Sequence, residues 1–325
     1  MLNVVVTGSQ GFIGSYICQE LLDNGYNVIG IDNYAKYGFV DRPHDKHPNF
    51  TFLCHDLTKS FPRRDIALKG YPSYLIAAAA SIGGISYFDK YAFDLVCTND
   101  RINCNTFEYA IDAHELGYLK KIVPISSSMV YENCFEYPSK EEFVASSPSP
   151  SSTYGFNKLN LEYYAYGANK QYGLPYTIVR PFNAVGIGEE DVIKGNTHVL
   201  PDLVYKALSR NRIDRFPILG DGKQVRHYTH AKDIARGVRL AMESDHLGAF
   251  NISSSRSTSV KELAEMVWGR IHDTRPKFKY EKPLEHDVQK RVPCVEKAKE
   301  LLGFEAKISL EESIDEVIKW VKKKV

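Results

Sequence analysis

Several features that mark whole classes of protein are scarce or missing in this chain of 325 residues. Its six cysteines form no C-x-x-C pair, so we expect neither a bound metal nor a disulfide framework. The net charge is only +1 and the sole lysine run is 322–324, so a nucleic-acid partner is not expected. No apolar run reaches the roughly 18–20 residues of a membrane span. Glycines at 83 and 84 interrupt the longest candidate, and we expect no membrane association.

The N-terminus also lacks the charged, apolar and small-residue regions of a secretory signal peptide. Hydrophobic residues make up 43% of the chain and charged residues 25%, as in ordinary globular proteins. These features predict a cytoplasmic protein whose cysteines are reduced. The length exceeds that of a typical single domain, so we expect one large domain and a smaller lobe.

The first half of the chain alternates short β-branched runs with longer amphipathic segments. We expect strands at 4–7, 28–32, 50–55, 74–80, 122–126 and 176–180, and helices at 12–24, at 93–116 and from residue 154. This rhythm predicts an α/β fold, a doubly wound parallel sheet of the Rossmann type.

After about residue 183 the rhythm loosens. Helices are expected at 201–209, 233–242, 260–272 and 314–322. We therefore expect a dinucleotide-binding and catalytic domain at 1–182. Residues 183–325 are expected to form a smaller α/β lobe, mainly for substrate, with some segments returning to the first domain.

A glycine-rich turn opens the chain at 7–14, where the sequence is Thr-Gly-Ser-Gln-Gly-Phe-Ile-Gly. Glycines let the backbone approach a pyrophosphate, which then lies on the N-terminus of the following helix. Asp32 ends the next strand, 18 residues after Gly14, as expected of a carboxylate that binds ribose hydroxyls. Such a carboxylate repels a 2′-phosphate, so NAD is favoured over NADP. The predicted contacts of this turn and strand end are Gly8, Gly11, Phe12, Ile13, Gly14, Asp32 and Asn33. Asp56 fits two interpretations equally well, a hydrogen bond to adenine or the N-cap of a helix.

Tyr154 and Lys158 are four residues apart and share one face of a predicted helix. Tyr166 with Lys170 and Tyr228 with Lys232 have the same spacing, so position must decide among them. Only Tyr154 follows the strand end with serines at 126–128 and precedes the strand end at 181–183. Strand ends of an open α/β sheet meet at one cleft, so Gly8, Asp32, 77–81, 126–128 and 181–183 should line it.

The chemistry of this pair fits a base that removes a proton from a hydroxyl group. A phenol with a pKa of about 10 is a poor base at neutral pH, but an ammonium and a nicotinamide cation favour the phenolate. Lys158 supplies the ammonium. A serine hydroxyl orients the substrate and relays the proton, while a hydride leaves the same carbon for the nicotinamide.

Together these motifs make the chain similar to the extended short-chain dehydrogenases that act on nucleotide sugars. The resemblance covers nearly the whole chain, and its further motifs are 31–33, 55–57, 77–80, Asn99, 126–131, 180–183, 219–222 and 225–226. It implies that Ser127 assists Tyr154, that Asn183 contacts the sugar or phosphate, and that Arg226 and Arg291 hold the diphosphate. It further implies cofactor contacts at Leu57, Ala78, Ala79, Ala80, Asn99, Ser126, Tyr154, Lys158 and Pro181. Implied substrate contacts are Ser81, Gly83, Ser128, Asn183, His198, Val199, Arg226 and Arg291.

Departures from the family pattern narrow the reaction. Dehydratases of this family place an acidic pair where this chain has Ser128 and Met129, and its decarboxylases carry a carboxylate at the second position. GDP-mannose 3,5-epimerases and GDP-fucose synthases carry a catalytic cysteine there, and a thioether has no proton to give. His198 matches their proton donor, although a substrate-binding or core histidine would look the same.

The simplest reaction left is epimerisation at C4 of a UDP- or GDP-linked sugar, with a hydride borrowed and returned by tightly bound NAD. The alternatives are a keto-sugar reductase, a 3,5-epimerase of the GDP-fucose synthase type and a non-catalytic NAD-sensing regulator. The resemblance also implies a homodimer, in which the helices at 93–116 and 154–172 would form a four-helix bundle.

Overall fold

A five-stranded parallel sheet lies at the centre of the computed structural model, which describes residues 1–82, 90–194, 197–209, 215–283 and 288–325. The strands are β1 (Asn3–Thr7), β2 (Asn27–Asp32), β3 (Phe50–Cys54), β4 (Tyr74–Ala77) and β5 (Lys121–Pro124). Their order is β3-β2-β1-β4-β5. The chain therefore turns from one side of β1 to the other, and ligands of open α/β sheets bind at this switch point.

Two more parallel strands continue this sheet beyond β5. Bridges join Ile122 to Tyr176 and Ile125 to Val179, and so connect β5 to β6 (Thr177–Pro181). β6 in turn pairs in parallel with β11 (Gly248–Ile252). The expected strands are confirmed, although β4 ends at Ala77 rather than at residue 80. β11 was not expected, because its five residues carry no clear alternation.

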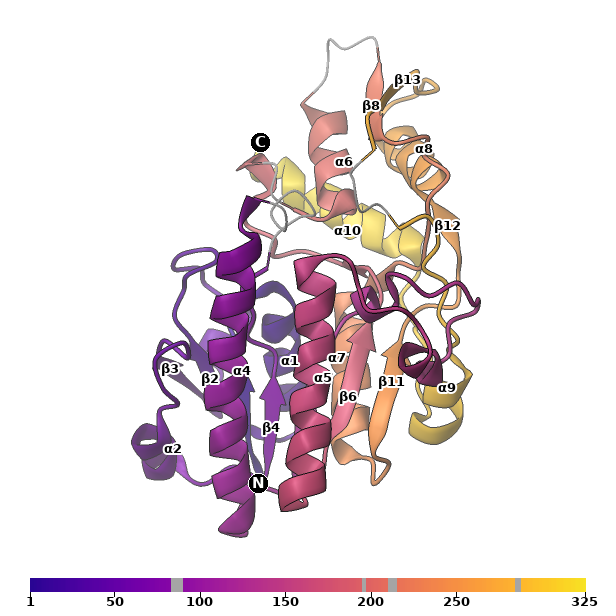
Figure 1. The fold of residues 1–325 in the computed structure, drawn as a ribbon. Helices are drawn as coiled ribbons and strands as arrows, with labels where there is room; N and C mark the ends of the chain where they lie inside the picture. Colours follow the sequence, from indigo (N-terminus) through magenta and orange to yellow (C-terminus); the bar gives the residue numbers. More distant parts are fainter. Residues whose placement is uncertain (83–89, 195–196, 210–214, 284–287) are drawn as a thin grey trace.

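Helices cover both faces of the sheet, as Figure 1 shows. α4 (Ala92–Glu115) and α5 (Thr153–Tyr172) lie side by side on one face, and α1 (Phe12–Asp23) and α7 (Ala231–Glu243) pack together on the other. The apolar side of each pair meets the sheet in its own buried cluster. This arrangement is the doubly wound Rossmann-type fold that the sequence predicted.

The placement of α7 corrects one expectation. Its sequence position suggested the second lobe, but Ile234, Val238 and Ala241 are fully buried in the cluster that also contains Ile17 and Leu21 of α1. The short helix α9 (Glu296–Leu302) joins the same cluster through Ala298. Periodicity shows that a helix has an apolar face, but it does not show which surface that face covers.

The second lobe has a core of its own, at the top of Figure 1. Its helices are α6 (Val199–Leu208), α8 (Val260–Ile271) and α10 (Leu310–Lys322), beside β8 (Phe216–Leu219) and β13 (Phe278–Glu281). Shorter elements complete the described chain, namely α2 (Arg63–Lys69), β7 (Ala184–Val185), β9 (Val225–Arg226), β10 (Thr229–His230), β12 (Thr258–Ser259) and 3₁₀ turns at Pro43–Lys46, Ser128–Tyr131, Glu141–Ala145 and Val192–Lys194. Among the described residues, no helix is both long enough and apolar enough to cross a membrane.

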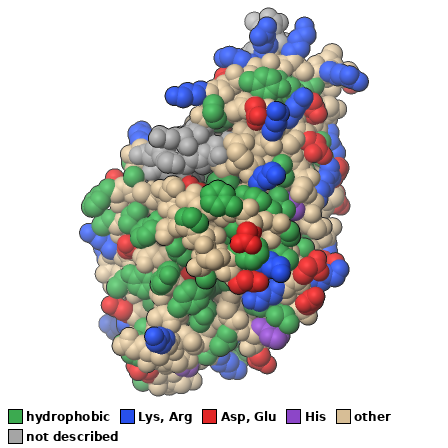
Figure 2. Space-filling view, turned by 45° about the vertical axis from the view of Figure 1, so that its right-hand side comes forward, with side chains coloured by type: hydrophobic (Ala, Val, Ile, Leu, Met, Phe, Trp, Pro, Cys, Tyr) green, Lys and Arg blue, Asp and Glu red, His purple; other side chains and the backbone are tan. Residues whose placement is uncertain are grey.

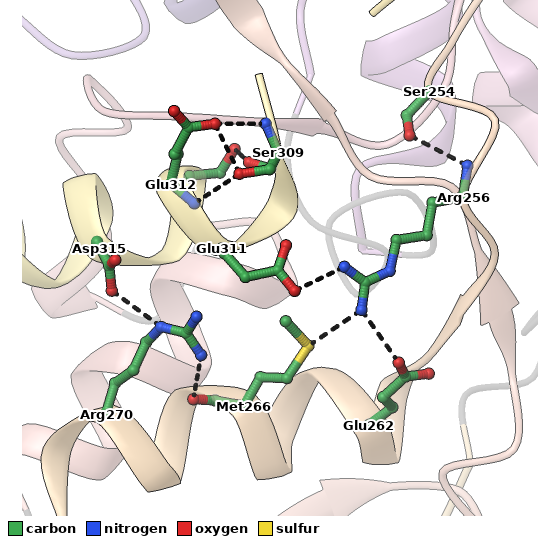
Figure 3. Close-up of polar contacts among 10 residues, drawn as sticks. Ser254, Arg256, Glu262, Met266, Arg270, Ser309, Glu311, Glu312 and Asp315 are labelled. Atoms are coloured by element: carbon green, nitrogen blue, oxygen red, sulfur yellow. Dashed lines mark hydrogen bonds and ion pairs between the residues drawn. The ribbon is translucent and has the colours of Figure 1, made fainter. Parts of the chain in front are cut away.

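Ion pairs join α8 to α10 on the surface of this lobe (Figure 3). Arg256 lies 2.7 Å from Glu311 and 3.3 Å from Glu262, and Arg270 lies 2.9 Å from Asp315. Exposed pairs of this kind contribute up to about 1 kcal/mol each. The apolar cluster beneath them therefore provides most of the attachment between the two helices.

Among the glycines that the structure describes, Gly14 has the least room. A Cβ at this position would lie 1.9 Å from the carbonyl oxygen of Gly8. We expect Gly14→Ala to lower the free energy of unfolding by at least about 2 kcal/mol, because this backbone contact cannot relax without moving α1. Gly269→Ala is the control, since that exposed glycine of α8 has open space around it. Urea denaturation of both variants tests the prediction, and equal stabilities would contradict it.

Candidate active site

The glycine-rich turn connects β1 to α1 and presents backbone groups to the end of the sheet. Gly8 has a φ of +72°, and a Cβ there would lie 2.8 Å from the Cα of Ala79. Gly11 is the N-cap of α1, where no described side chain caps the first turn and no acidic residue occurs in it. The free N–H groups and the helix dipole suit an anion such as a pyrophosphate. Phe12, Ile13 and Gly14 follow in the first turns of the helix.

Asp32 is held at the end of β2 by backbone groups on both sides. Its Oδ2 accepts from the Gln10 N–H at 3.1 Å, and its Oδ1 accepts from the Tyr34 N–H at 2.8 Å. Asn33 uses its side-chain oxygen to accept from the Ala35 N–H. The Asp32 carboxylate is partly exposed and keeps lone pairs for further donors such as ribose hydroxyls.

Asp56 does not begin a helix, so the N-cap interpretation is wrong. Its Oδ1 accepts from the N–H and hydroxyl of Thr58 in a local turn, and this lowers the pKa of the Asp56 carboxyl. The next α-helix begins seven residues later, at Arg63. Leu57 is buried in the core beside α4. A contact of Asp56 with adenine stays a prediction.

The chain after β4 is fixed by two side chains. Thr7 accepts hydrogen bonds from the N–H groups of Ala78 and Ala79, both at 3.0 Å. Asn99, buried in α4, accepts from the Ser81 N–H at 2.6 Å and donates to the Ser81 carbonyl at 3.0 Å. The segment 78–81, including Ala80, is partly exposed, and its Ala78 and Ala79 lie beside Gly8. Gly83 lies outside the described residues.

The three serines after β5 have different environments. The Ser126 hydroxyl is buried and donates to Glu162 at 2.6 Å, so any contact of this residue with a cofactor falls to its backbone. Ser128 is also buried. Ser127 alone of the three is partly exposed, accepts from the Met129 N–H, and is hydrogen-bonded to Tyr154. Contacts of Ser126 with a cofactor and of Ser128 with a substrate stay predictions.

Tyr154 and Lys158 lie on the first turns of α5, and both are buried. The Lys158 ammonium donates to the Ile125 carbonyl at 2.8 Å and lies 5.8 Å from the centre of the Tyr154 ring. The competing pairs lie elsewhere. Tyr228 precedes β10 and shares no helix with Lys232, and the Tyr166 hydroxyl donates to Glu162 at 3.4 Å.

Burial opposes charge on both groups. It raises the pKa of Tyr154 to about 12, against the Ser127 hydrogen bond and the positive charge of Arg291. It lowers the pKa of Lys158 to about 8, against the negative charge of Glu162. The phenol therefore becomes a useful base at neutral pH only when a further positive charge lies beside it.

Four further predicted site residues lie in β6, in β9 and in the segments near them. Pro181 ends β6 in register with Ile252. Asn183 is partly exposed, has a φ of +32°, and donates to the His227 carbonyl at 3.3 Å. Arg226 is buried in β9, and the Arg291 N–H donates to the Val225 carbonyl at 3.1 Å. The two arginines that the resemblance assigned to a diphosphate thus lie on adjacent backbone segments.

His198 is the N-cap of α6 and is paired with Glu189, a residue that the sequence did not single out. The Glu189 carboxylate accepts from the His198 backbone N–H at 3.0 Å and contacts its Nδ1 at 2.8 Å. Glu189 raises the pKa of His198, while burial and the charges of Lys36 and Arg291 oppose this. Nδ1 is thereby occupied, and the side chain of His198 is 45% exposed. Val199 follows in the first turn of α6.

Arg42 is a second residue that no sequence pattern indicated. Its guanidinium is buried and donates to the Gln10 carbonyl at 2.8 Å and to the Gly188 carbonyl at 3.3 Å. It also lies 3.6 Å from Glu190. Arg42 thus connects the glycine-rich turn to the loop that carries Glu189.

A family model described as the NAD dependent epimerase/dehydratase family matches residues 4–253. UDP-glucuronic acid decarboxylase 4 of Arabidopsis thaliana is 29% identical over 332 residues, which cover 100% of this chain and 70% of that protein. A putative UDP-glucose 4-epimerase of Methanocaldococcus jannaschii is 28% identical over 320 residues and 98% of both chains.

Solved structures agree in fold over the whole chain. UDP-glucose 4-epimerase of Thermotoga maritima, solved with UDP-glucose, is 31% identical with a TM-score of 0.84 and 99% coverage of both chains. UDP-N-acetylglucosamine 4-epimerase of Methanobrevibacter ruminantium, in complex with UDP-N-acetylmuramic acid, is 26% identical with a TM-score of 0.85, covering 100% of this chain and 99% of that one.

Glu189→Gln is expected to lower the pKa of His198, because it removes the negative charge that stabilises the imidazolium. The titration of His198 followed by NMR in histidine-labelled protein measures this shift. Glu190→Gln is the matched control, since that neighbouring carboxylate pairs with Arg42 and Lys324 instead. Equal histidine titrations in the two variants would rule out the pairing.

Proposed function

The chain belongs to the NAD dependent epimerase/dehydratase family and uses NAD, and we propose that it is a nucleotide-sugar 4-epimerase. One observation carries the choice of reaction. Ser127, Tyr154 and Lys158 lie together, while the neighbouring positions 128 and 129 hold a serine and a methionine rather than acids. Such a site supports removal of the proton of one sugar hydroxyl group and its later return to the same oxygen.

The described residues fit a bound dinucleotide. Gly8 and Gly14 let the turn and α1 pack directly against backbone atoms of the chain, and the first turn of α1 presents N–H groups that no described side chain caps for the pyrophosphate. Asp32 would hold the ribose, and Lys158 the nicotinamide end. When bound, NAD supplies the acceptor and later the donor of a hydride, together with a positive charge that favours the Tyr154 phenolate.

The protein groups then act in a definite order. Ser127 orients the C4 hydroxyl of the sugar, and Tyr154 takes its proton while Lys158 stabilises the phenolate. Arg226 and Arg291 hold the diphosphate, about which the resulting 4-keto sugar turns its opposite face to the site. Tyr154 returns the proton to the C4 oxygen. Bound NAD would return the hydride to the opposite face of C4, so the product would be the C4 epimer.

Met129 supports this choice over decarboxylation, although decarboxylases are among the relatives. Its side chain is buried beside Leu95 and Tyr154. A thioether neither accepts nor donates a proton in this pH range, so the carboxylate that decarboxylases place here has no counterpart at this position.

Reduction of a nucleotide-linked keto sugar is the second candidate, and the His198–Glu189 pair favours it. A protonated imidazole is a suitable acid for a reaction that needs a second proton donor. Such an enzyme would consume reduced cofactor in each turnover, whereas an epimerase regenerates NAD in place.

We propose a UDP-linked sugar as substrate rather than a GDP-linked one, because the relatives and neighbours named above act on or bind UDP compounds.

In this proposal, residues 1–182 hold the cofactor together with returning segments such as α7, and 183–325 hold most of the substrate. All six cysteines are free thiols in the structure, which supports a reducing compartment such as the cytoplasm.

We expect the wild type to interconvert C4 epimers of a UDP-sugar without net formation of NADH, and Tyr154→Phe to lower kcat by about 10²–10⁴-fold because the base is lost. NMR of the products with absorbance of NADH measures both. Tyr118→Phe is the control, because it makes the same change at an exposed tyrosine that is distant in sequence from Tyr154. Stoichiometric consumption of NADH would identify the reductase, and an undiminished Tyr154→Phe variant would refute the assigned base.

We also propose a homodimer in which α4 and α5 of two copies form a four-helix bundle. Phe93, Phe156 and Tyr163 are exposed on these helices, at 79%, 49% and 64%. A shallow groove of about 350 Å³ between the helices is lined by Phe107, Ile111 and Tyr164 among others. Hydrophobic side chains are frequent on the lower part of the molecule in Figure 2. A second copy would cover this apolar face.

Tyr163→Glu is expected to convert the dimer to a monomer, since it places a charge in the middle of the proposed interface. Light scattering coupled to size exclusion measures the mass. Tyr280→Glu alters a tyrosine of β13 that is 52% exposed and should leave the dimer intact. A monomeric wild type, or a dimer that survives Tyr163→Glu, would overturn this interface.

A further inference from the structure

A pair of opposite charges lies fully buried one helical turn beyond Lys158. Glu162 is 0% exposed and Arg180 is 1% exposed, and two hydrogen bonds of 2.8 and 2.7 Å join them. Glu162 comes from α5 and Arg180 from β6. Neither residue contributes to the chemistry described above, and the sequence pattern had used Arg180 only as part of a family motif.

Further hydrogen bonds satisfy both groups. Glu162 also accepts from the hydroxyls of Ser126 at 2.6 Å and Tyr166 at 3.4 Å. Arg180 also donates to the Tyr131 hydroxyl at 2.6 Å and to the Glu141 carbonyl at 2.9 Å. The pair thereby ties the end of β5 and the turn after it to α5 and β6.

The network continues to the segment that carries Arg291. The Tyr131 hydroxyl donates to the Asn251 side chain at 2.8 Å, and Asn251 donates to the carbonyls of Ser139 and Cys294 at 3.0 and 3.1 Å. Ser139 in turn pairs with the backbone of Val292 and Cys294. One continuous set of hydrogen bonds thus joins α5 to the segment that carries Arg291.

We propose that the Glu162–Arg180 pair is a positioning unit for the reaction, in which the Glu162 carboxylate keeps Lys158 charged beside Tyr154 while Arg180 anchors that carboxylate. This inference rests on the proposed roles of Tyr154 and Lys158. It does not depend on the identity of the sugar, nor on the choice between epimerisation and reduction.

Stability alone does not account for this pair. The cost of burying two charges is commonly as large as their attraction, so an apolar pair of similar volume is often as stable. A carboxylate at this place has an electrostatic effect that an apolar residue lacks. Burial draws the pKa of Lys158 down to about 8, and Glu162 acts in the opposite direction.

The charge of Lys158 matters because the pair of Tyr154 and Lys158 loses its first proton from one residue or the other. Loss from Tyr154 gives the active phenolate with an ammonium, and loss from Lys158 gives an inactive phenol with an amine. By favouring the ammonium, Glu162 shifts this balance toward the active form. The fraction of active enzyme changes tenfold for each pKa unit.

Other charged and titratable groups surround the Glu162–Arg180 pair. Tyr166 lies on α5, Arg180 on β6, and Tyr131 and Glu141 on the turns after β5. Arg291 favours the Tyr154 phenolate from the segment beyond β13. Loss of the Glu162 charge would leave Arg180 as an uncompensated cation, which opposes the ammonium of Lys158.

Glu162→Gln tests the proposal in the full-length enzyme loaded with NAD. We expect the high-pH plateau of kcat to fall by about tenfold and the apparent pKa of its acidic limb to fall by about one unit, with KM unchanged. A variant that only loosened the fold would not move the apparent pKa. An unchanged plateau and an unchanged apparent pKa would overturn the proposal.

Two further variants keep the test informative. Glu141→Gln removes another buried carboxylate of the same network, one that accepts from the Asn251 N–H at 2.8 Å, and should lower stability without moving the pH profile. If Glu162→Gln does not fold, the double variant Glu162→Gln with Arg180→Met removes both charges and should show a smaller shift of the same sign. A pH profile moved equally by Glu141→Gln would contradict a specific role for Glu162.

Direct titration of Lys158 separates this inference from the proposed reaction. NMR of lysine-labelled, NAD-loaded protein, with the signal assigned by Lys158→Met, should show a lower pKa of Lys158 in Glu162→Gln than in the wild type. This shift is expected even if no sugar is epimerised. An unshifted Lys158 pKa would refute the role of Glu162 whatever the activity, whereas a shifted pKa without epimerisation would leave only the proposed reaction in error.

Discussion

The close contact between Gly14 and the carbonyl of Gly8 is the constraint from which the site is built. Because no Cβ fits between them, α1 begins directly against the turn that leaves β1. The same turn brings Gly8 against Ala79 at the end of β4. The adjacent ends of β1 and β4, where the strand order reverses, therefore form a cradle made of backbone rather than of side chains.

Burial of the catalytic groups determines how the site is charged. Tyr154 and Lys158 are both buried, so the pKa of Tyr154 rises and the pKa of Lys158 falls. Both shifts oppose the charged forms of these side chains. Three charges restore the balance from different directions. Arg291 acts on Tyr154, Glu162 acts on Lys158, and the nicotinamide of bound NAD adds the third. Removal of any one would alter the protonation of groups it does not touch.

Segments far apart in the sequence hold the two lobes together. α7 and α9 return from the second half of the chain to the core around α1. Arg42 joins the glycine-rich turn to the loop of Glu189, and Asn251 joins β11 to the segment that leads to Arg291. The regions that we propose for cofactor and for substrate are thereby linked through buried hydrogen bonds as well as through the covalent chain.

The sequence by itself determined the parallel α/β fold, the glycine-rich turn, Asp32 and the Tyr154–Lys158 pair, because these features are local and follow the period of a strand or a helix. The tertiary structure alone decided that the Ser126 hydroxyl donates to Glu162, and that α7 packs on the sheet beside α1. It also revealed Glu189, Glu162 and Arg42 as partners of the site. Such pairings depend on which distant segments meet, and burial then decides which charges matter; neither is encoded in the spacing of nearby residues.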